Sequence, residues 1–294
     1  MNEIINKLSY NEKETKIYIP NEIFNDLEGL HVKGSSHVAF AYSFYYLTSW
    51  LYRYCKYGQI EIDTKMIKEL LGYHPDNKVI NYIIKKNGVL DELGYTMTTT
   101  DYPVAWEYED GLEFVLLSDL DTDAKKMLQS KKGKNYKIKV PIKGIWRSKE
   151  SEEEGIEDGT FYEVDNTHCV PFEVFIECME NDQLGCIGFY LYCYMKSKYQ
   201  IFETGYDVSL TELERCTGLS HKTLCRYLDR LKKYRMITCD VQNFVLGLDK
   251  GERKSNTYHV NDWELFSDKP MSYVKAQVLK LDEYQKMQEE QWEF

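Results

Sequence analysis

The order of apolar and polar segments along the chain occurs twice. The first copy spans about residues 16–120 and opens with the extended pattern KIYIPNEIF. An apolar, aromatic stretch at residues 38–54 then predicts a buried helix, and two shorter helical patterns and a hairpin follow. The second copy begins near residue 160 and repeats this order, with its aromatic helix at residues 186–199. Because a repeated plan indicates repeated structure, we expect two similar units.

The second copy contains a pattern typical of two helices joined by a tight turn. Ser209 can cap the first helix, and Glu212 three residues later would complete a capping box. Gly218 suits the turn because glycine adopts positive φ without steric cost. Leu219 is expected to fill the angle between the helices, and Ser220 to cap the second helix. The inward positions of the first helix are Leu210, Leu213 and Cys216.

The second helix of this pair divides into an apolar stripe and a basic face. Leu224, Leu228 and Leu231 recur at i, i+4 and i+7, which predicts the buried side. Between Ser220 and Arg235 there are six basic residues and one acid, Asp229. The basic face consists of Lys222, Arg226, Arg230 and Lys233. A charged helix face is usually only solvated, but here the preceding capped helix, the turn and the following hairpin favour binding to DNA.

The hairpin after this helix has the composition of a wing that contacts phosphates. It runs from residue 236 to 260 around the loop GLDKGERKSN. Contacts to the DNA backbone are expected from Lys250, Arg253 and Lys254. The early residues of a recognition helix approach the base edges most closely, so base contacts are expected from His221, Lys222, Thr223 and Arg226, and Ser220 beside them is also expected to lie at the DNA.

The equivalent pair of helices in the first copy is weaker as a DNA reader. Its second helix would present Asn77, Lys78, Asn81 and Lys85, and the following hairpin is acidic at Glu107, Glu109 and Asp110. Two alternatives are open: this copy contacts DNA, or it mediates protein interaction. Its aromatic helix has more apolar surface than one small domain easily buries, which favours a homodimer through this copy.

The predicted fold class is α+β and helix-rich, with two winged helix-turn-helix domains in tandem and a C-terminal helix. The expected units are an N-terminal winged-helix domain at residues 1–147, an acidic, mobile linker at residues 148–159 and a DNA-binding winged-helix domain at residues 160–266. A helix capped by Ser272 is expected within residues 267–294, with Val274, Val278 and Leu281 on one face.

Charge changes this picture in one segment. The 294-residue chain has a net charge of −11, which argues against indiscriminate coating of nucleic acid but leaves a local site open. Residues 124–149 contain ten basic and no acidic residues, between two acidic blocks. Tyr136 and Trp146 lie among these lysines. The segment could therefore follow a nucleic-acid backbone, neutralise the acidic blocks, or form a surface strand.

The remaining composition excludes several classes of protein. No export signal or membrane span is indicated, which predicts a cytoplasmic protein. The eight cysteines form no Cys-x-x-Cys pair and are expected to be reduced core thiols; His221 and Cys225 alone are weak evidence for a metal. No catalytic motif is present, and an acidic pair such as Asp119 and Asp121 is insufficient for a nuclease. We expect neither an enzyme nor a cofactor.

The two-copy plan resembles replication-initiation proteins of Gram-positive plasmids and phages, which include tandem winged-helix initiators and the DnaD-like N-terminal domain. The resemblance covers the architecture of residues 16–260 and the specific motif of residues 209–260. It implies double-stranded DNA as the ligand, dimerisation through the first copy, and contact with host replication proteins. The acidic sequence pI of about 5.2 departs from the resemblance, because it argues against strong binding of origin DNA by both units. A transcriptional regulator and a protein-protein adaptor without DNA affinity are the alternatives.

Overall fold

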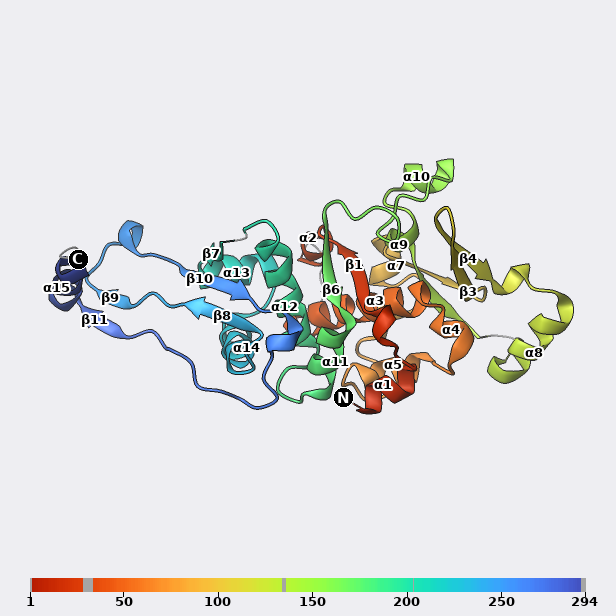
Figure 1. The fold of residues 1–294 in the computed structure, drawn as a ribbon, viewed down its shortest axis with the longest axis horizontal. Coiled ribbons are helices and arrows are strands. Elements are labelled where there is room, and N and C mark those ends of the chain that lie inside the picture. The colour runs from red at the N-terminus through yellow and green to blue at the C-terminus, as the bar shows by residue number, and fades with distance from the viewer. Residues whose placement is uncertain (1, 29–33, 134–135, 203, 292–294) are drawn as a thin grey trace.

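Two aromatic helices pack against each other at the centre of the molecule. The structure is a computed structural model that describes residues 2–28, 34–133, 136–202 and 204–291. Helix α3 (Ser35–Arg53) comes from the first copy and α12 (Gly185–Tyr199) from the second, and they lie side by side (Figure 1). Both helices are apolar around most of their circumference, which is the pattern of a helix buried on all sides.

The extended openers of the two copies form one antiparallel ladder. Strand β1 (Lys16–Pro20) pairs with β6 (Thr167–Pro171), so that Tyr18 lies opposite Cys169. Each strand leads into a helix, α2 (Ile23–Glu28) or α11 (Phe172–Glu180). Equivalent elements of the two copies therefore meet each other, as they do in the isologous interface of a symmetric dimer. Here that arrangement forms within one chain.

The two copies share a single hydrophobic core. Trp50 stacks on Phe172 with ring centroids 4.0 Å apart, and Tyr46 stacks on Phe175 at 5.6 Å. The aromatic residues of α3 that suggested self-association are at most 2% exposed within one chain: Phe40, Tyr42, Phe44, Tyr45, Tyr46 and Trp50. The buried residues of the two predicted units form one cluster, and the ground for dimerisation through α3 is removed, because α12 and α11 already cover that surface.

The first half contains many short elements around α3. Its remaining helices and strands are α1 (Asn2–Leu8), η1 (Glu12–Glu14), α4 (Lys56–Gln59), α5 (Thr64–Leu70), α6 (Asn81–Ile84), α7 (Val89–Glu92), β2 (Thr96–Thr99), β3 (Pro103–Tyr108), β4 (Leu112–Leu116), η2 (Leu117–Asp119), α8 (Thr122–Lys132), β5 (Ile138–Pro141), α9 (Ile142–Ile145) and α10 (Lys149–Glu154). Strands β3 and β4 form the acidic hairpin, whereas β2 pairs with the distant β5.

The continuous second helix expected in the first copy does not form. Its residues are divided between α6 and α7, and residues 74–80 are turns. The Asn77 side chain accepts a hydrogen bond from the Val79 N–H, which favours a turn over a helix. At Gly88 the backbone approaches so closely that an added Cβ would lie 2.5 Å from the Tyr82 carbonyl oxygen. Glycine therefore permits the break between the two short helices.

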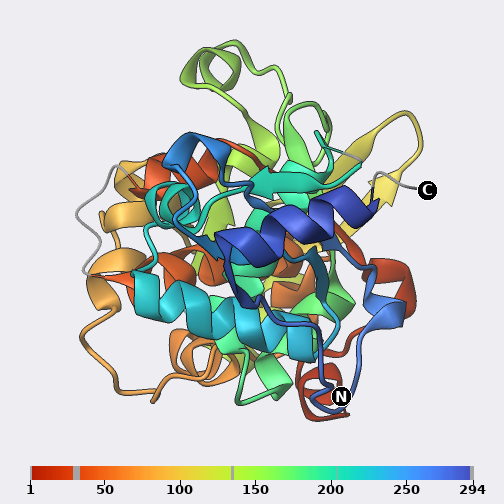
Figure 2. The same cartoon turned by 90° about the vertical axis from the view of Figure 1, so that its left-hand side faces the viewer.

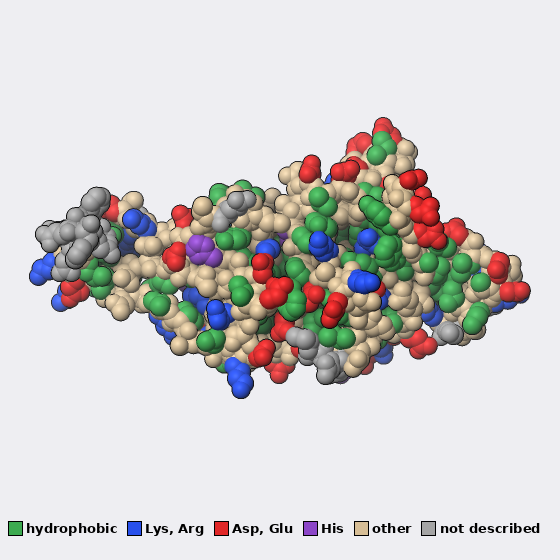
Figure 3. Space-filling model, in the orientation of Figure 1, with side chains coloured by type: hydrophobic (Ala, Val, Ile, Leu, Met, Phe, Trp, Pro, Cys, Tyr) green, Lys and Arg blue, Asp and Glu red, His purple; other side chains and the backbone are tan. Residues whose placement is uncertain are grey.

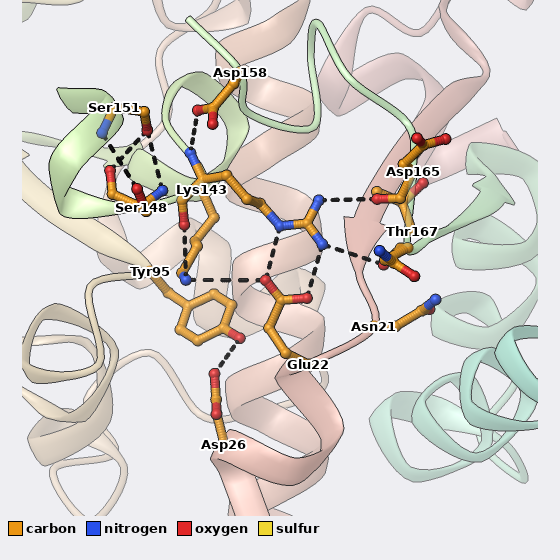
Figure 4. A network of polar contacts seen from close by, with 12 residues as sticks. Asn21, Glu22, Asp26, Tyr95, Lys143, Ser148, Ser151, Asp158, Asp165 and Thr167 are labelled. Carbon is orange, nitrogen blue, oxygen red and sulfur yellow. Dashed lines mark hydrogen bonds and ion pairs between the residues drawn. The ribbon is translucent and has the colours of Figure 1, made fainter. Parts of the chain in front are cut away.

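The expected acidic linker is a capped helix that is anchored to the body. Ser148 caps α10, and its side chain accepts the Ser151 N–H. Figure 4 shows the polar network beside it, in which the Arg147 guanidinium donates two hydrogen bonds of 2.8 Å to Glu22. The Arg147 N–H also donates to Asp158, at the other end of the segment. The segment predicted as a linker therefore contains a short helix, and hydrogen bonds hold both of its ends.

The second half adds a three-stranded sheet and a long extension. Its elements after α12 are β7 (Tyr206–Val208), α13 (Leu210–Thr217), α14 (His221–Lys233), β8 (Ile237–Asp240), β9 (Phe244–Leu246), η3 (Lys250–Glu252), β10 (Asn256–Val260), η4 (Trp263–Leu265), β11 (Val278–Lys280) and α15 (Leu281–Gln291). The sheet has the order β7-β10-β8, with antiparallel pairs. In Figure 2, α15 crosses the front of this half and α14 is seen lengthwise behind it.

The C-terminal helix begins nine residues later than Ser272. Residues 272–277 are extended, and β11 pairs in parallel with β9 of the wing. Val274 and Val278 are 78% and 67% exposed, so no apolar helix face forms there. The backbone groups of β9 explain this difference, because an edge strand has unpaired N–H and C=O groups that hydrogen-bond directly to an added strand such as β11.

These elements confirm the helix-rich α+β class, with about 48% helix and 17% strand. Among the described residues, no helix combines the length and apolar character that a membrane crossing requires.

Candidate nucleic-acid interface

Helix α13 and its turn have most of the predicted geometry. The Ser209 side chain accepts the Glu212 N–H at 3.2 Å and so caps the helix. The reciprocal half of the capping box is absent, because the Glu212 carboxylate pairs with Arg215 at 2.5 Å. That hydrogen bond lowers the pKa of Glu212 to about 2. Gly218 ends the helix at φ +63°, and Leu219 is buried at 2% exposure beneath the turn.

The first half of the chain fixes the beginning of α14. The Ser220 N–H donates a hydrogen bond of 2.9 Å to Ser35 Oγ, at the start of α3. The Ser220 hydroxyl caps no backbone N–H and instead donates to Thr223 Oγ1 at 2.9 Å. Helix α13 also packs against α2. The orientation of the two helices therefore depends on contacts with the first copy, which the local sequence pattern did not indicate.

The two faces of α14 divide as predicted. Leu224, Leu228 and Leu231 are 0–3% exposed and pack into the shared core. On the opposite side, His221, Lys222 and Arg226 are exposed, and Thr223, Arg230 and Lys233 are half-buried. In Figure 3, Lys and Arg side chains gather over the position of α14, whereas acidic side chains cluster over α10 and the β3–β4 hairpin.

Three cations on this face lack an acidic partner. Within the described part of the chain, Lys222, Arg226 and Arg230 form no ion pair at 4.0 Å or less. The guanidinium groups of both arginines lie over the Tyr227 ring, 5.2 and 4.8 Å from its centroid. This stacking holds both planar groups while their N–H donors stay available for an acceptor. Sequence reasoning missed the role of Tyr227, although its place between the two arginines was visible.

Other predicted contact residues are already engaged. Lys233 pairs with Asp229 at 2.7 Å, and Asp229 also accepts the Tyr273 hydroxyl at 2.5 Å. Burial acts to raise the pKa of Asp229, but its hydrogen bonds with Lys233 and Tyr273 hold it below the ordinary value. His221 contacts Glu214 at 3.1 Å. The basic face available to a ligand is therefore narrower than the predicted set.

The wing residues lie on the extension beyond the sheet. Arg253 and Lys254 are exposed and line a groove of about 940 Å³, to which Tyr284 and Met287 of α15 also contribute. The Arg253 guanidinium lies 4.9 Å from the centre of the Phe244 ring and donates to the Leu248 carbonyl at 3.2 Å. Lys250 begins η3, but its side chain is outside the described residues.

The basic stretch at residues 124–149 is largely used inside the fold. Lys139 pairs with Asp91 at 2.5 Å and Arg147 with Glu22, while Lys132 donates to the carbonyls of Tyr57 and Ile60. The Tyr136 hydroxyl donates to the Ile62 carbonyl, and Trp146 packs against the core. Neutralisation and packing thus account for these groups, and the two aromatic residues are partly buried against the core.

The one pair of side chains suggested as metal ligands is close together but has no third partner among the described residues. His221 Nε2 and Cys225 Sγ are 3.6 Å apart, but no group of three metal-ligating side chains occurs among the residues described. The chain matches no protein-family model, no curated protein and no solved structure in the comparisons. Its function is therefore argued from geometry alone.

Proposed function

We propose that this chain is a sequence-specific double-stranded DNA-binding protein, and that α13, α14 and the sheet β7-β10-β8 form its winged helix-turn-helix. One observation carries the proposal: α14 has a buried leucine stripe and, on its opposite face, the cations Lys222, Arg226 and Arg230, which form no ion pair with any carboxylate of the described residues. A net charge of −11 means that a basic helix face of this kind does not simply follow from the overall composition of the chain. The first copy, with its broken second helix, does not present a second face of this kind.

The residues of α14 would divide between base and backbone contacts. Arg226 is exposed near the middle of the helix, and a guanidinium can donate two hydrogen bonds to the O6 and N7 atoms of guanine. Ser220, His221, Lys222 and Thr223 lie at the amino-terminal end, where a recognition helix meets the base edges. Arg230, with Arg253 and Lys254 on the wing, would contact phosphates and set the register of the protein on the duplex.

Among DNA-binding proteins, a replication initiator is our preferred assignment over a transcriptional regulator. Regulators that read palindromes present two equivalent units through a homodimer. Here the equivalent elements β1 and β6, and α3 and α12, pair inside one chain. In this proposal α13 and α14 are the one helix-turn-helix among the described residues, because the second helix of the first copy is broken. One such chain suits an asymmetric site, and several chains suit the directly repeated sites of an origin. Cytoplasmic DNA of a plasmid or phage is the corresponding target.

A protein-protein adaptor is the second candidate, because one surface favours it. On the acidic β3–β4 hairpin, Trp106 and Tyr108 are 40% and 70% exposed. Exposed aromatic side chains are enriched at protein interfaces. In the initiator this hairpin would contact host replication proteins; in the adaptor it would be the main binding surface and α14 would have no DNA ligand.

A titration of labelled duplex DNA from around the gene distinguishes these assignments. The wild-type chain should bind at low salt, and the combined Lys222→Ala, Arg226→Ala and Arg230→Ala variant should not. Lys126→Ala removes an exposed cation from α8 and is the matched control, which should bind as the wild type does. Equal affinity of all three proteins would exclude α14 as the DNA reader, and absence of any binding would leave the adaptor.

A further inference from the structure

A basic cavity lies in the first half, where the second copy has its continuous helix. It has a volume of about 440 Å³, is partly open to solvent, and is lined by residues of α5, residues 75–78, α6 and the strands β2 and β5. That volume falls within the range of about 300–1,000 Å³ typical of small-molecule sites. The break between α6 and α7 places Lys85 and Lys86 at its edge. The departure from a regular helix-turn-helix thus creates the cavity.

The charge of this cavity contrasts with that of the whole molecule. Seven lysines line it, against two acids, Asp63 and Asp76. Both acids already have partners: Asp63 accepts the Met66 N–H as the cap of α5, and Asp76 pairs with Lys65 at 2.9 Å. Of the other lysines, Lys139 is paired with Asp91 outside the cavity. The remaining ones keep a positive charge without a carboxylate in the described part of the chain.

Lys68 is the buried centre of this charge. Its side chain is only 5% exposed, and its ammonium donates to two neutral acceptors, the Asn77 carbonyl at 2.7 Å and Asn81 Oδ1 at 2.6 Å. Burial lowers the pKa of Lys68, and the nearby Asp76 carboxylate, which pairs with Lys65, offsets only part of this effect. An anion in the cavity would supply a counter-charge and accept the third N–H.

The floor of the cavity is apolar. Phe44, Ile67, Ile84 and Ile138 form it and are at most 6% exposed, beneath the lysines of the rim. An extended DNA backbone needs a charged surface rather than a concave site with an apolar floor. The combination suits a small molecule that has both a flat apolar part and a strongly charged group.

We propose that this cavity binds a small phosphorylated molecule with an apolar body, of the class that mononucleotides represent. The Lys68 ammonium would meet the phosphate, with Lys85, Lys86 and Lys137 at the rim, and the base would lie against the apolar floor. Lysine suits this task because it is a compact charge with three donors. The site is separate from α14, so its occupation does not depend on the proposed DNA binding.

The test is calorimetric titration of the full chain with ATP, AMP, inorganic phosphate and adenosine. ATP should bind more tightly than inorganic phosphate or adenosine, because only a nucleotide engages both rim and floor. Lys68→Met should weaken ATP binding on the order of tenfold, as loss of a charge-assisted hydrogen bond predicts. Since Lys68 is buried, the exposed Lys86→Glu and Lys137→Glu variants provide a second measurement that does not rely on its folding, and each should also weaken binding.

Lys126→Glu makes the same charge change on the exposed face of α8 and should leave ATP affinity unchanged. No ATP binding to the wild type at millimolar concentration would overturn the proposal. Equal losses from Lys86→Glu, Lys137→Glu and Lys126→Glu would also overturn it, because they would show nonspecific attraction. Competition with short duplex DNA would also overturn the proposal. If the duplex displaces ATP from the wild type, and Lys86→Glu weakens binding of the duplex, the cavity binds the DNA backbone.

Discussion

Tyr42 and His168 are 126 residues apart in the chain and share a hydrogen bond of 2.6 Å inside the common core. Asn21 Oδ1 lies 2.9 Å from His168 Nδ1 and accepts a hydrogen bond from the Nδ1–H group. Nε2 therefore carries no hydrogen and accepts the hydrogen bond from the Tyr42 hydroxyl. Burial lowers the pKa of His168 to about 3, so the imidazole is neutral in the folded protein. A polar contact of this kind links the two copies as specifically as the aromatic packing around it.

The first prediction is that acid destabilises the fold through His168. The unfolded imidazole titrates near its ordinary pKa of 6.5 and the folded one near 3, so its stabilising effect is complete above pH 6.5 and is lost as the pH falls toward 3. At pH 5 the loss is roughly 2 kcal/mol, at about 1.4 kcal/mol per pKa unit. Urea denaturation at pH 7.5 and pH 5 measures it.

His168→Gln provides the control for other groups that titrate in this range. It keeps a polar side chain but removes the ionisation, so its free energy of unfolding should fall less between the two pH values than that of the wild type. The same dependence on pH in both proteins would show that the imidazole is not held neutral.

The second prediction concerns the connection between the copies. If a specific protease site replaces residues 151–156, at the end of α10 and just after it, and is cleaved, the two fragments should remain together in size-exclusion chromatography. The β1–β6 ladder and the packing of α3 on α12 hold them independently of that connection. Urea should separate the fragments in one transition, and fragments that part in native buffer would contradict a shared core.

The third prediction separates base contact from phosphate contact. Arg226→Ala should cost roughly 1–3 kcal/mol of affinity on the preferred duplex and little on random sequence. Lys254→Ala should weaken binding to both duplexes alike and reduce the salt slope by about one unit. Fluorescence anisotropy at several salt concentrations measures both quantities. A uniform effect of Arg226→Ala on the two duplexes would assign this residue to the backbone.

The fourth prediction concerns the ion pair between Arg147 and Glu22. Burial acts to raise the pKa of Glu22, while the hydrogen bonds from Arg147 hold it below the ordinary value. Arg147→Ala should therefore raise that pKa and lower the free energy of unfolding at pH 7 by roughly 1–3 kcal/mol. Denaturation curves measure the change. Lys149→Ala breaks an exposed ion pair and should lower the free energy of unfolding by less than about 0.5 kcal/mol. An equal loss from both variants would argue against a stabilising role of the Arg147–Glu22 pair.

Periodicity in the sequence located the helix pair because its determinants are local. Leu224, Leu228 and Leu231 recur at helical spacing, and Gly218 adopts the positive φ that the turn needs. The basic stretch was ambiguous for the opposite reason, since the partner of Arg147, Glu22, is 125 residues away. Likewise, no local pattern indicates that β1 pairs with β6, or that α12 covers the aromatic side of α3.

The β1–β6 ladder joins segments about 150 residues apart, and this has a consequence during synthesis. Strand β1 leaves the ribosome early, but its partner does not exist until more than half of the chain has been made. Until then the aromatic face of α3 has no α11 or α12 to cover it, and closing so long a loop is slow. The nascent first half is thus the stage most exposed to aggregation, and chain termination before residue 167 yields a fragment that cannot complete its core.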